Sequence, residues 1–412
     1  MAEIKPEVET FARIKVVGVG GSGSNAVSSM VECKLSGVEF VAINTDAQDL
    51  HHCKATEKIH IGKNLTKGLG AGMNPELGRQ AAEENRDEIH EILKGSDMIF
   101  VVYGAGGGTG SGAGPIVAEA AKEAGALTVG VVTKPFSFEG KQRAAIAEES
   151  IENLRDRVDT LITVQNDKLL QIIDKNISLI NAFRIVDDVL RQGVQGISDL
   201  ITKPGIVNVD FADVRSIMQD SGSALMGIGI SSGDNRAIQA AKQAINSPLL
   251  DISIEGASGI LFNVTGSEDL TMLEVNEAAS IITENVDPNA RIIFGASSDE
   301  SVKKGEIKIT VVATGFDERN YDPSREFSSG GKVGIRNESS DDDASMFTSK
   351  KINSDNENKN FYGGTSPRSS MTIEEKRMEK GISEDEDRSP LDNIDPDDDL
   401  EIPAFIRKKL GK

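Results

Sequence analysis

The stretch Gly104-Ala105-Gly106-Gly107-Gly108-Thr109-Gly110-Ser111-Gly112-Ala113-Gly114 decides the fold class of this chain. It follows a short apolar run, Ile99 to Tyr103, that is typical of a buried strand, and it precedes an expected helix over Pro115 to Glu123. Glycines at a strand-to-helix turn let backbone N–H groups converge on a phosphate, and Thr109 and Ser111 add hydroxyls. The stretch therefore predicts a phosphate-binding loop in an α/β domain.

A second glycine-rich loop, Gly18-Val19-Gly20-Gly21-Ser22-Gly23, lies between an expected strand at Ile14 to Val19 and a helix expected to begin near Asn25. Its spacing fits G-x-G-x-x-G, so an NAD site has to be considered. A dinucleotide fold usually closes its second strand with an acidic residue. Here that strand ends in Asn44-Thr45-Asp46, which leaves the alternative open.

A third glycine-rich stretch, Gly68-Leu69-Gly70-Ala71-Gly72-Met73-Asn74-Pro75, could close over the same ligand. Three such loops suit a triphosphate better than a pyrophosphate. The chain has no G-x-x-x-x-G-K-[ST] motif, so it is not a P-loop NTPase. Any single loop could be only a tight turn between strand and helix.

The order of apolar patterns predicts two folded units. Short apolar runs alternate with helical periods up to Thr133, which is typical of a parallel α/β sheet. A helical period spans 176–203 and stops at Lys203-Pro204-Gly205, and the order β-α-β-α-β-β follows it. We therefore expect an α/β chain divided as follows: an N-terminal extension (1–12), a parallel-sheet nucleotide-binding domain (13–175), a central helix (176–203), a smaller mixed-sheet α/β domain (204–316), a disordered acidic linker (317–399) and a tail peptide (400–412).

The composition of the chain limits the kinds of partner it can bind and the compartment in which it works. The 412 residues carry a net charge of −21, which disfavours nucleic acid and anionic membrane as partners of the main surface. Two cysteines, Cys33 and Cys53, without CxxC spacing indicate a reduced, cytoplasmic setting. No apolar stretch approaches about 18 residues, so we expect no direct membrane insertion. The group His51, His52, Cys53 and His60 lacks regular zinc spacing, so we expect no metal there and interpret these residues as surface positions.

Three motifs together resemble a known family. Gly106 to Gly112 is similar to the signature loop of the tubulin/FtsZ superfamily of GTPases, and Asn208-Val209-Asp210-Phe211-Ala212-Asp213 resembles the catalytic loop of bacterial FtsZ proteins. The tail Ile402-Pro403-Ala404-Phe405-Ile406 resembles the C-terminal peptide of the same family. The resemblance covers about residues 12 to 316 and the tail, and the tail favours the FtsZ branch over tubulin.

The resemblance implies that residues 13–175 form a GTP-binding domain, that residues 204–316 form a GTPase-activating domain, and that residues 400–412 are a partner-binding tail peptide. Glycine-loop backbone groups would hold the phosphates, Glu139 and Arg143 would contact the ribose and nucleotide, and Asp187 would pair with guanine. The implied catalytic residues are Asn208, Asp210 and Asp213. The implied nucleotide-binding residues are Gly20, Gly21, Ser22, Gly23, Ser24, Asn25, Asn44, Asp46, Ala71, Gly72, Gly107, Gly108, Thr109, Gly110, Glu139, Arg143, Asn166, Phe183 and Asp187.

Several of these residues have a plainer interpretation. Glu139 and Arg143 fit an exposed helical i, i+4 pair, and Asp187 fits the solvent side of the long helix with Phe183 in the core. Asp210 and Asp213 fit the cap of a helix expected over Val214 to Met218. A carboxylate offers only acceptors, however, so Asp187 would suit the adjacent N–H donors of guanine and not adenine.

Some positions depart from the family pattern. Ser22 and Ser24 stand where glycine is common, Ala105 where methionine is usual and Ser111 where threonine is usual, and Val164-Gln165 replaces Ile-Pro. None of these changes removes a charged group, but they leave nucleotide affinity open.

The resemblance thus implies a GTPase of the division ring that forms filaments. Head-to-tail subunits would share each site, with Asp210 and Asp213 acting on the neighbour's GTP and Mg²⁺ bridging the charges. Ile402, Pro403, Phe405 and Ile406 would bind membrane-anchored division proteins, which would concentrate the protein at mid-cell. The alternatives are an NAD-dependent oxidoreductase and a GTP-binding structural filament without turnover.

Overall fold

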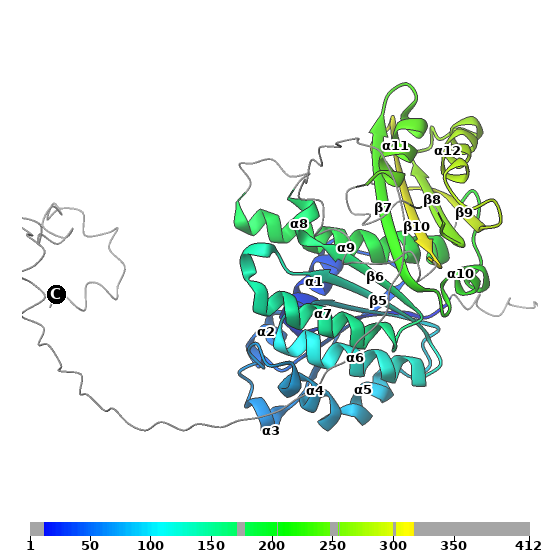
Figure 1. The fold of residues 1–412 in the computed structure, drawn as a ribbon. Helices are drawn as coiled ribbons and strands as arrows, with labels where there is room; N and C mark the ends of the chain where they lie inside the picture. Colours follow the sequence, from blue (N-terminus) through cyan, green and yellow to red (C-terminus); the bar gives the residue numbers. More distant parts are fainter. Residues whose placement is uncertain are drawn as a thin grey trace, which may run out of the picture. The chain divides into compact units, whose positions relative to one another are not determined.

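The computed structural model describes residues 12–170, 178–203, 205–247, 254, 256–299 and 302–316. The expected extension up to residue 11, the linker and the tail peptide lie outside these ranges. Within the described residues, one sheet runs in the order β3-β2-β1-β4-β5-β6-β7-β10-β8-β9 (Figure 1). Its first part consists of parallel strands: β1 (Ile14–Val19), β2 (Val38–Asn44), β3 (Glu57–His60), β4 (Met98–Gly104), β5 (Leu127–Lys134) and β6 (Thr160–Gln165).

Helices cover both faces of the parallel strands (Figure 1). Successive residues of a strand point to opposite faces. Val16 accordingly joins the apolar core that includes residues of α1 and α9, and Val17 joins the one that includes residues of α5 and α6. The helices of this part are α1 (Gly20–Glu32), α2 (Ala47–His52), α3 (Lys63–Thr66), α4 (Pro75–Glu84), α5 (Arg86–Leu93), α6 (Gly108–Glu123), η1 (Ser137–Glu139), α7 (Lys141–Arg155) and α8 (Asn166–Leu169).

The long helix predicted over 176–203 is α9 (Leu179–Thr202) in the described residues. The Ser178 hydroxyl caps it by accepting a hydrogen bond from the Asn181 N–H at 3.3 Å. Its apolar face, which includes Leu190, Val194 and Ile197, is buried against the core shared with α1. The helix therefore lies against the parallel sheet and leads from it to the second part of the chain.

The second part has the predicted order β-α-β-α-β-β. Its sheet is mixed, because β10 pairs antiparallel with β7 and β8 while β8 and β9 are parallel. The parallel part and the mixed part expected from the sequence join in one sheet, because β6 and β7 pair in parallel from Thr160↔Gly222 to Ile162↔Ala224. The elements are α10 (Phe211–Met218), β7 (Gly222–Ser232), α11 (Arg236–Ile245), β8 (Gly259–Gly266), α12 (Met272–Glu284), β9 (Arg291–Ser298) and β10 (Glu306–Thr314).

Three helices begin earlier than the sequence predicted. Helix α1 begins at Gly20 instead of near Asn25, α6 begins at Gly108 instead of Pro115, and α10 begins at Phe211 instead of Val214. The glycines of α6 allow α4 to pack closely against it: a Cβ on Gly112 would lie 1.9 Å from the Pro75 carbonyl oxygen of α4. The glycine run is therefore the first two turns of a helix that another helix approaches closely.

Candidate nucleotide-binding site

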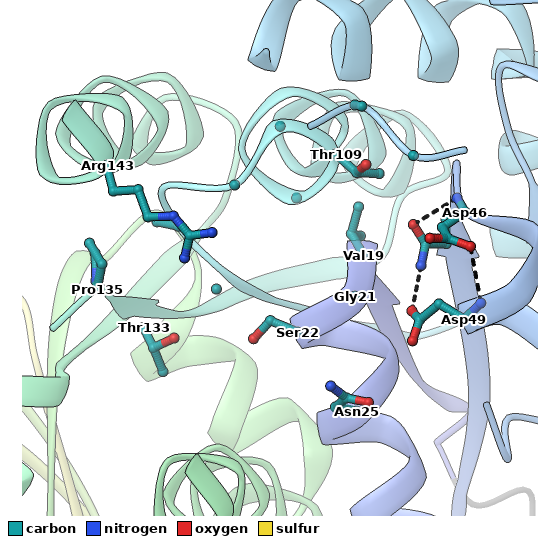
Figure 2. Close-up of a pocket in the computed structure, with 18 of the residues that line it drawn as sticks. Val19, Gly21, Ser22, Asn25, Asp46, Asp49, Thr109, Thr133, Pro135 and Arg143 are labelled. Atoms are coloured by element: carbon teal, nitrogen blue, oxygen red, sulfur yellow. Dashed lines mark hydrogen bonds between the residues drawn. The ribbon is translucent and has the colours of Figure 1, made fainter. Parts of the chain in front are cut away.

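A pocket of about 590 Å³ lies where the parallel strands end (Figure 2). Val19 closes β1, Asn44 closes β2 and Gly104 closes β4, and all three line it. The carboxyl ends of parallel strands, at the point where the strand order reverses, are the usual ligand site of an open α/β sheet. The order β3-β2-β1-β4-β5-β6 is also that of dinucleotide-binding folds, so the fold alone fits the NAD alternative too.

The three glycine-rich loops meet at this pocket. Gly20 has φ +71°, and a Cβ there would lie 2.8 Å from the Gly110 nitrogen, so only glycine suits this contact between the first two loops. The Gly108 N–H donates to the Gly72 carbonyl at 2.9 Å, which joins the third loop to the first. Neither α1 nor α6 has a side-chain cap, and both begin at the pocket, so their positive ends suit an anion.

Polar side chains from the β2 end form one wall. Asp46 caps α2 by accepting hydrogen bonds from the Gln48 and Asp49 N–H groups at 2.8 and 3.1 Å. The Asn44 amide donates to the Asp49 carboxylate at 2.6 Å. Burial and the Asp46 carboxylate raise the pKa of Asp49, against the lowering effect of Ser24 and Asn44. Two carboxylates thus stand beside the glycine loops (Figure 2).

Glu139 and Arg143 form an ion pair at the opposite wall. Glu139 also accepts a hydrogen bond from the Phe136 N–H at 2.9 Å, and only 14% of its side chain is exposed. The plainer interpretation of an exposed i, i+4 pair is therefore wrong for Glu139, which lies in η1 and faces the pocket.

Asn166, Phe183 and Asp187 line the far part of the pocket. Phe183 is 41% exposed and meets the Phe136 ring edge-on at 5.6 Å, so it is not the core residue of the plainer interpretation. Burial raises the pKa of Asp187 to about 6. An aromatic face beside amide and carboxylate acceptors suits a planar base with adjacent N–H donors.

The pocket brings together most of the predicted nucleotide set. Gly20, Gly23 and Ser24 do not line it, and all three are buried in α1. The predicted residues that line it are Gly21, Ser22, Asn25, Asn44, Asp46, Ala71, Gly72, Gly107, Gly108, Thr109, Gly110, Glu139, Arg143, Asn166, Phe183 and Asp187. Lining residues that the sequence reasoning missed are Val19, Asp49, Leu69, Gly70, Gly104, Ala105, Thr133, Pro135 and Val186. A position at a strand end or in a glycine loop was the available signal for all of these residues except Asp49 in α2 and Val186 in α9.

The predicted catalytic residues do not line this pocket. Asn208, Asp210 and Asp213 are exposed in the segment that follows α9. The Asp210 carboxylate accepts a hydrogen bond from the Ala212 N–H at 3.3 Å and so caps α10, as the plainer interpretation had it. Asp210 lines a separate hollow together with Arg13 and Asp97, which precede β1 and β4. It therefore lies at the amino-end edge of the sheet, opposite the pocket.

Among the described residues, no group of three or more His, Cys, Asp or Glu could hold a metal ion. The histidine and cysteine group is not wholly at the surface as expected, because Cys53 is buried and His60 is partly buried. Mg²⁺ is commonly bound by one or two carboxylates together with substrate phosphates. Asp46, which lines the pocket beside the glycine loops, fits that donor set.

Among the residues that the structure describes, no helix is long and apolar enough to cross a membrane.

Comparisons with known proteins agree with this geometry. The family model "Tubulin/FtsZ family, GTPase domain" matches residues 13–174, and "FtsZ family, C-terminal domain" matches residues 222–317. The solved FtsZ dimer of M. jannaschii, in its empty form, is 47% identical, with a TM-score of 0.73 over 76% of this chain and 90% of that chain. A mutant of the same protein is 48% identical, with the same TM-score, over 76% of this chain and 93% of that one. GDP-bound CetZ1 from Haloferax volcanii, 22% identical over 74% of this chain and 94% of its own, shares the fold with a TM-score of 0.64.

The fold, the three glycine loops and the first family match define a GTPase of the tubulin-like class. The match over the second part and the identity to solved FtsZ narrow this class. The chain belongs to the FtsZ family, whose members are GTP-binding, cytoskeleton-like proteins of cell division.

Proposed function

We propose that this chain hydrolyses GTP at the contact between head-to-tail copies of itself. The observation that carries the proposal is the separation of two half-sites. Phe183 and Asp187 line the pocket near the start of α9, and the helix beyond Asp187 is long enough to carry the chain about 22 Å further. Asp210 follows that far end at the amino-end edge of the sheet, Asp213 comes three residues later, and both are exposed. Their carboxylates reach a phosphate only if it belongs to another copy.

In this proposal the pocket holds the nucleotide in a fixed direction. The uncapped first turns of α1 and α6 receive the phosphates, with Ala71 and Gly72 at the γ-phosphate. Glu139 and Arg143 hold the ribose side. Asn166 and the ionised Asp187 accept hydrogen bonds from the N–H donors of guanine, and adenine does not present the same donors. Phe183 packs against the base.

Asp210 and Asp213 act on the next subunit's nucleotide. Each carboxylate is an acceptor that can orient a water for attack on the γ-phosphate, and Asn208 shapes the loop by accepting a hydrogen bond from the Gly205 N–H at 2.6 Å. Mg²⁺, held by Asp46 and the phosphates, would supply charge neutralisation. Hydrolysis then requires assembly, so each round of hydrolysis weakens a contact that GTP helped to form.

The proposal extends to location and partners. Ile402, Pro403, Phe405 and Ile406 form an apolar peptide beside basic residues at the end of an acidic segment. Such a peptide suits a groove on a membrane-anchored division protein. The protein would then be cytoplasmic and concentrated at mid-cell, without inserting into the membrane itself.

The test is a pair of carboxamide variants, Asp210→Asn and Asp213→Asn, each compared with Asp220→Asn, which removes an exposed carboxylate just beyond α10. GDP affinity should be unchanged in all three proteins, because no substituted residue lines the pocket. GTP turnover should fall at least tenfold in the first two and stay normal in the third. Normal turnover in both loop variants would contradict the proposal.

A further inference from the structure

We propose that Asp49 limits how tightly the pocket holds the phosphate chain, because its carboxylate repels the phosphates and so speeds nucleotide release. The inference rests on the proposed function, since it requires phosphates against the glycine loops. Asp49 is thereby a residue that sets affinity and exchange rate.

The position of Asp49 carries the argument. Its carboxylate lies beside Gly21: a Cβ built on Gly21 would lie 3.6 Å from Asp49 Oδ2. Gly21 lies in the uncapped first turn of α1, where a phosphate is expected. Figure 2 shows Asp49 directly beside this turn, and both residues line the pocket. A negative charge therefore stands at the place where the ligand brings its own.

The usual reason for an acidic residue here does not account for this placement. Asp49 lies in the first turn of α2, where a carboxylate favours the helix dipole. Asp46 already caps that helix with hydrogen bonds to two of its N–H groups. The Asp49 carboxylate instead bonds the Asn44 amide at 2.6 Å, which fixes it towards the pocket. Helix stability alone would be served equally by a side chain turned to solvent.

The repulsion has a distinctive signature. Coulomb energy scales with the ligand charge and is screened by salt. Removing the Asp49 charge should therefore leave guanosine binding unchanged, tighten GMP binding slightly and tighten GDP and GTP binding most. We expect the affinity for GDP to rise about tenfold at low salt, which corresponds to about 1.4 kcal/mol. The gain should appear mainly as slower release.

The experiment uses the full chain with Asp49→Asn, which keeps an oxygen to accept the Asn44 hydrogen bond. Asp49→Ala serves as a second variant and Glu152→Gln, exposed on α7, as the charge-matched control. Dissociation constants for guanosine, GMP, GDP and GTP, and release rates of GDP, are measured at two salt concentrations, with thermal unfolding to check folding. The expected result is a gain that grows along the ligand series in both Asp49 variants and shrinks with salt, while Glu152→Gln follows the wild type.

Two results would overturn the inference. Unchanged GDP affinity in both Asp49 variants would show that the carboxylate does not repel the phosphates. Weaker GDP binding would show that Asp49 assists binding, for instance by holding a cation. Both would leave the proposed function intact, whereas a wild-type chain that binds neither GDP nor GTP would refute the proposed function itself.

Discussion

Lys203 and Asp299 form an ion pair, with 2.8 Å between Nζ and Oδ2, that joins the end of α9 to the turn after β9. Lys203 also pairs with Asp199 at 3.0 Å, one turn back in the helix. The segment then bridges Val207 to Ala296 of β9. The chain that leads to Asp210 and Asp213 is thus fixed to the second part of the sheet, so movements of that part would carry both carboxylates.

Lys203→Met should destabilise the protein because Asp199 would lose its cationic partner. Asp199 is 6% exposed. Burial raises its pKa above the usual value, although the Lys203 cation lowers it in part. Removing one partner of a buried ion pair costs about 3–5 kcal/mol, and the cost should be at the low end here because 27% of the Lys203 side chain is exposed. Urea unfolding monitored by circular dichroism measures the difference, with the exposed Lys304→Met as control. Equal stability of Lys203→Met and wild type would show that the pair is not a structural link.

GDP affinity should fall as the pH drops through about 6, the pKa to which burial raises Asp187. Guanine needs the ionised carboxylate as acceptor, so below this pH the ligand has to displace a proton. The phosphates of the nucleotide titrate in the same range. Asp187→Asn is therefore the control, because it binds the same ligand without the carboxylate. The effect of Asp187 is the loss of GDP affinity between pH 7.5 and 5.5 in the wild type beyond the loss in Asp187→Asn. Equal losses in the two proteins would argue against a contact between Asp187 and guanine.

Gly112→Ala should separate α4 from α6, because the new Cβ would lie 1.9 Å from the Pro75 carbonyl and 2.7 Å from the Arg79 nitrogen. Backbone atoms cannot move aside cheaply, so we expect a loss of about 3 kcal/mol or more. Gly107→Ala is the matched control, because no atom lies within 4 Å of its Cβ position and its φ is −89°. Thermal unfolding of the two nucleotide-free variants makes the comparison. A Gly112→Ala protein as stable as Gly107→Ala would mean that the two helices do not pack this tightly.

The order of elements could be predicted from the sequence, but their boundaries at the glycine loops could not. A short apolar run such as Met98 to Tyr103 indicates a strand by itself, and the spacing of apolar residues along α9 indicates a long helix. Glycine is a poor helix former, so Gly108 to Gly114 was expected to be a loop. It forms a helix that packs closely against α4, because the glycines have no side chains to keep the two backbones apart. This contact is made by residues distant in the sequence.

The glycine loops were predicted to bind phosphates from their own composition, whereas Glu139 and Asp187 were assigned to the nucleotide site through the family resemblance. Residues of all three loops, Glu139 and Asp187 line the pocket. Asp49 was missed because an acidic residue in the first turn of a helix has an ordinary explanation. Its direction depends on the Asn44 hydrogen bond, which sequence spacing does not reveal. The pairing of β6 with β7, which joins the two parts into one sheet, is likewise a contact between residues distant in the sequence, and only three residue pairs make it.

The central claim, a hydrolysis site shared between copies, is tested most directly by specific GTPase activity as a function of protein concentration, for the wild type and for Asp213→Ala. We predict negligible activity per molecule below a threshold concentration, a rise above it, and loss of that activity in Asp213→Ala with GTP binding retained. A specific activity that is independent of concentration, or a normally active Asp213→Ala, would contradict the shared site and leave Asp213 as an exposed acidic residue in the first turn of α10.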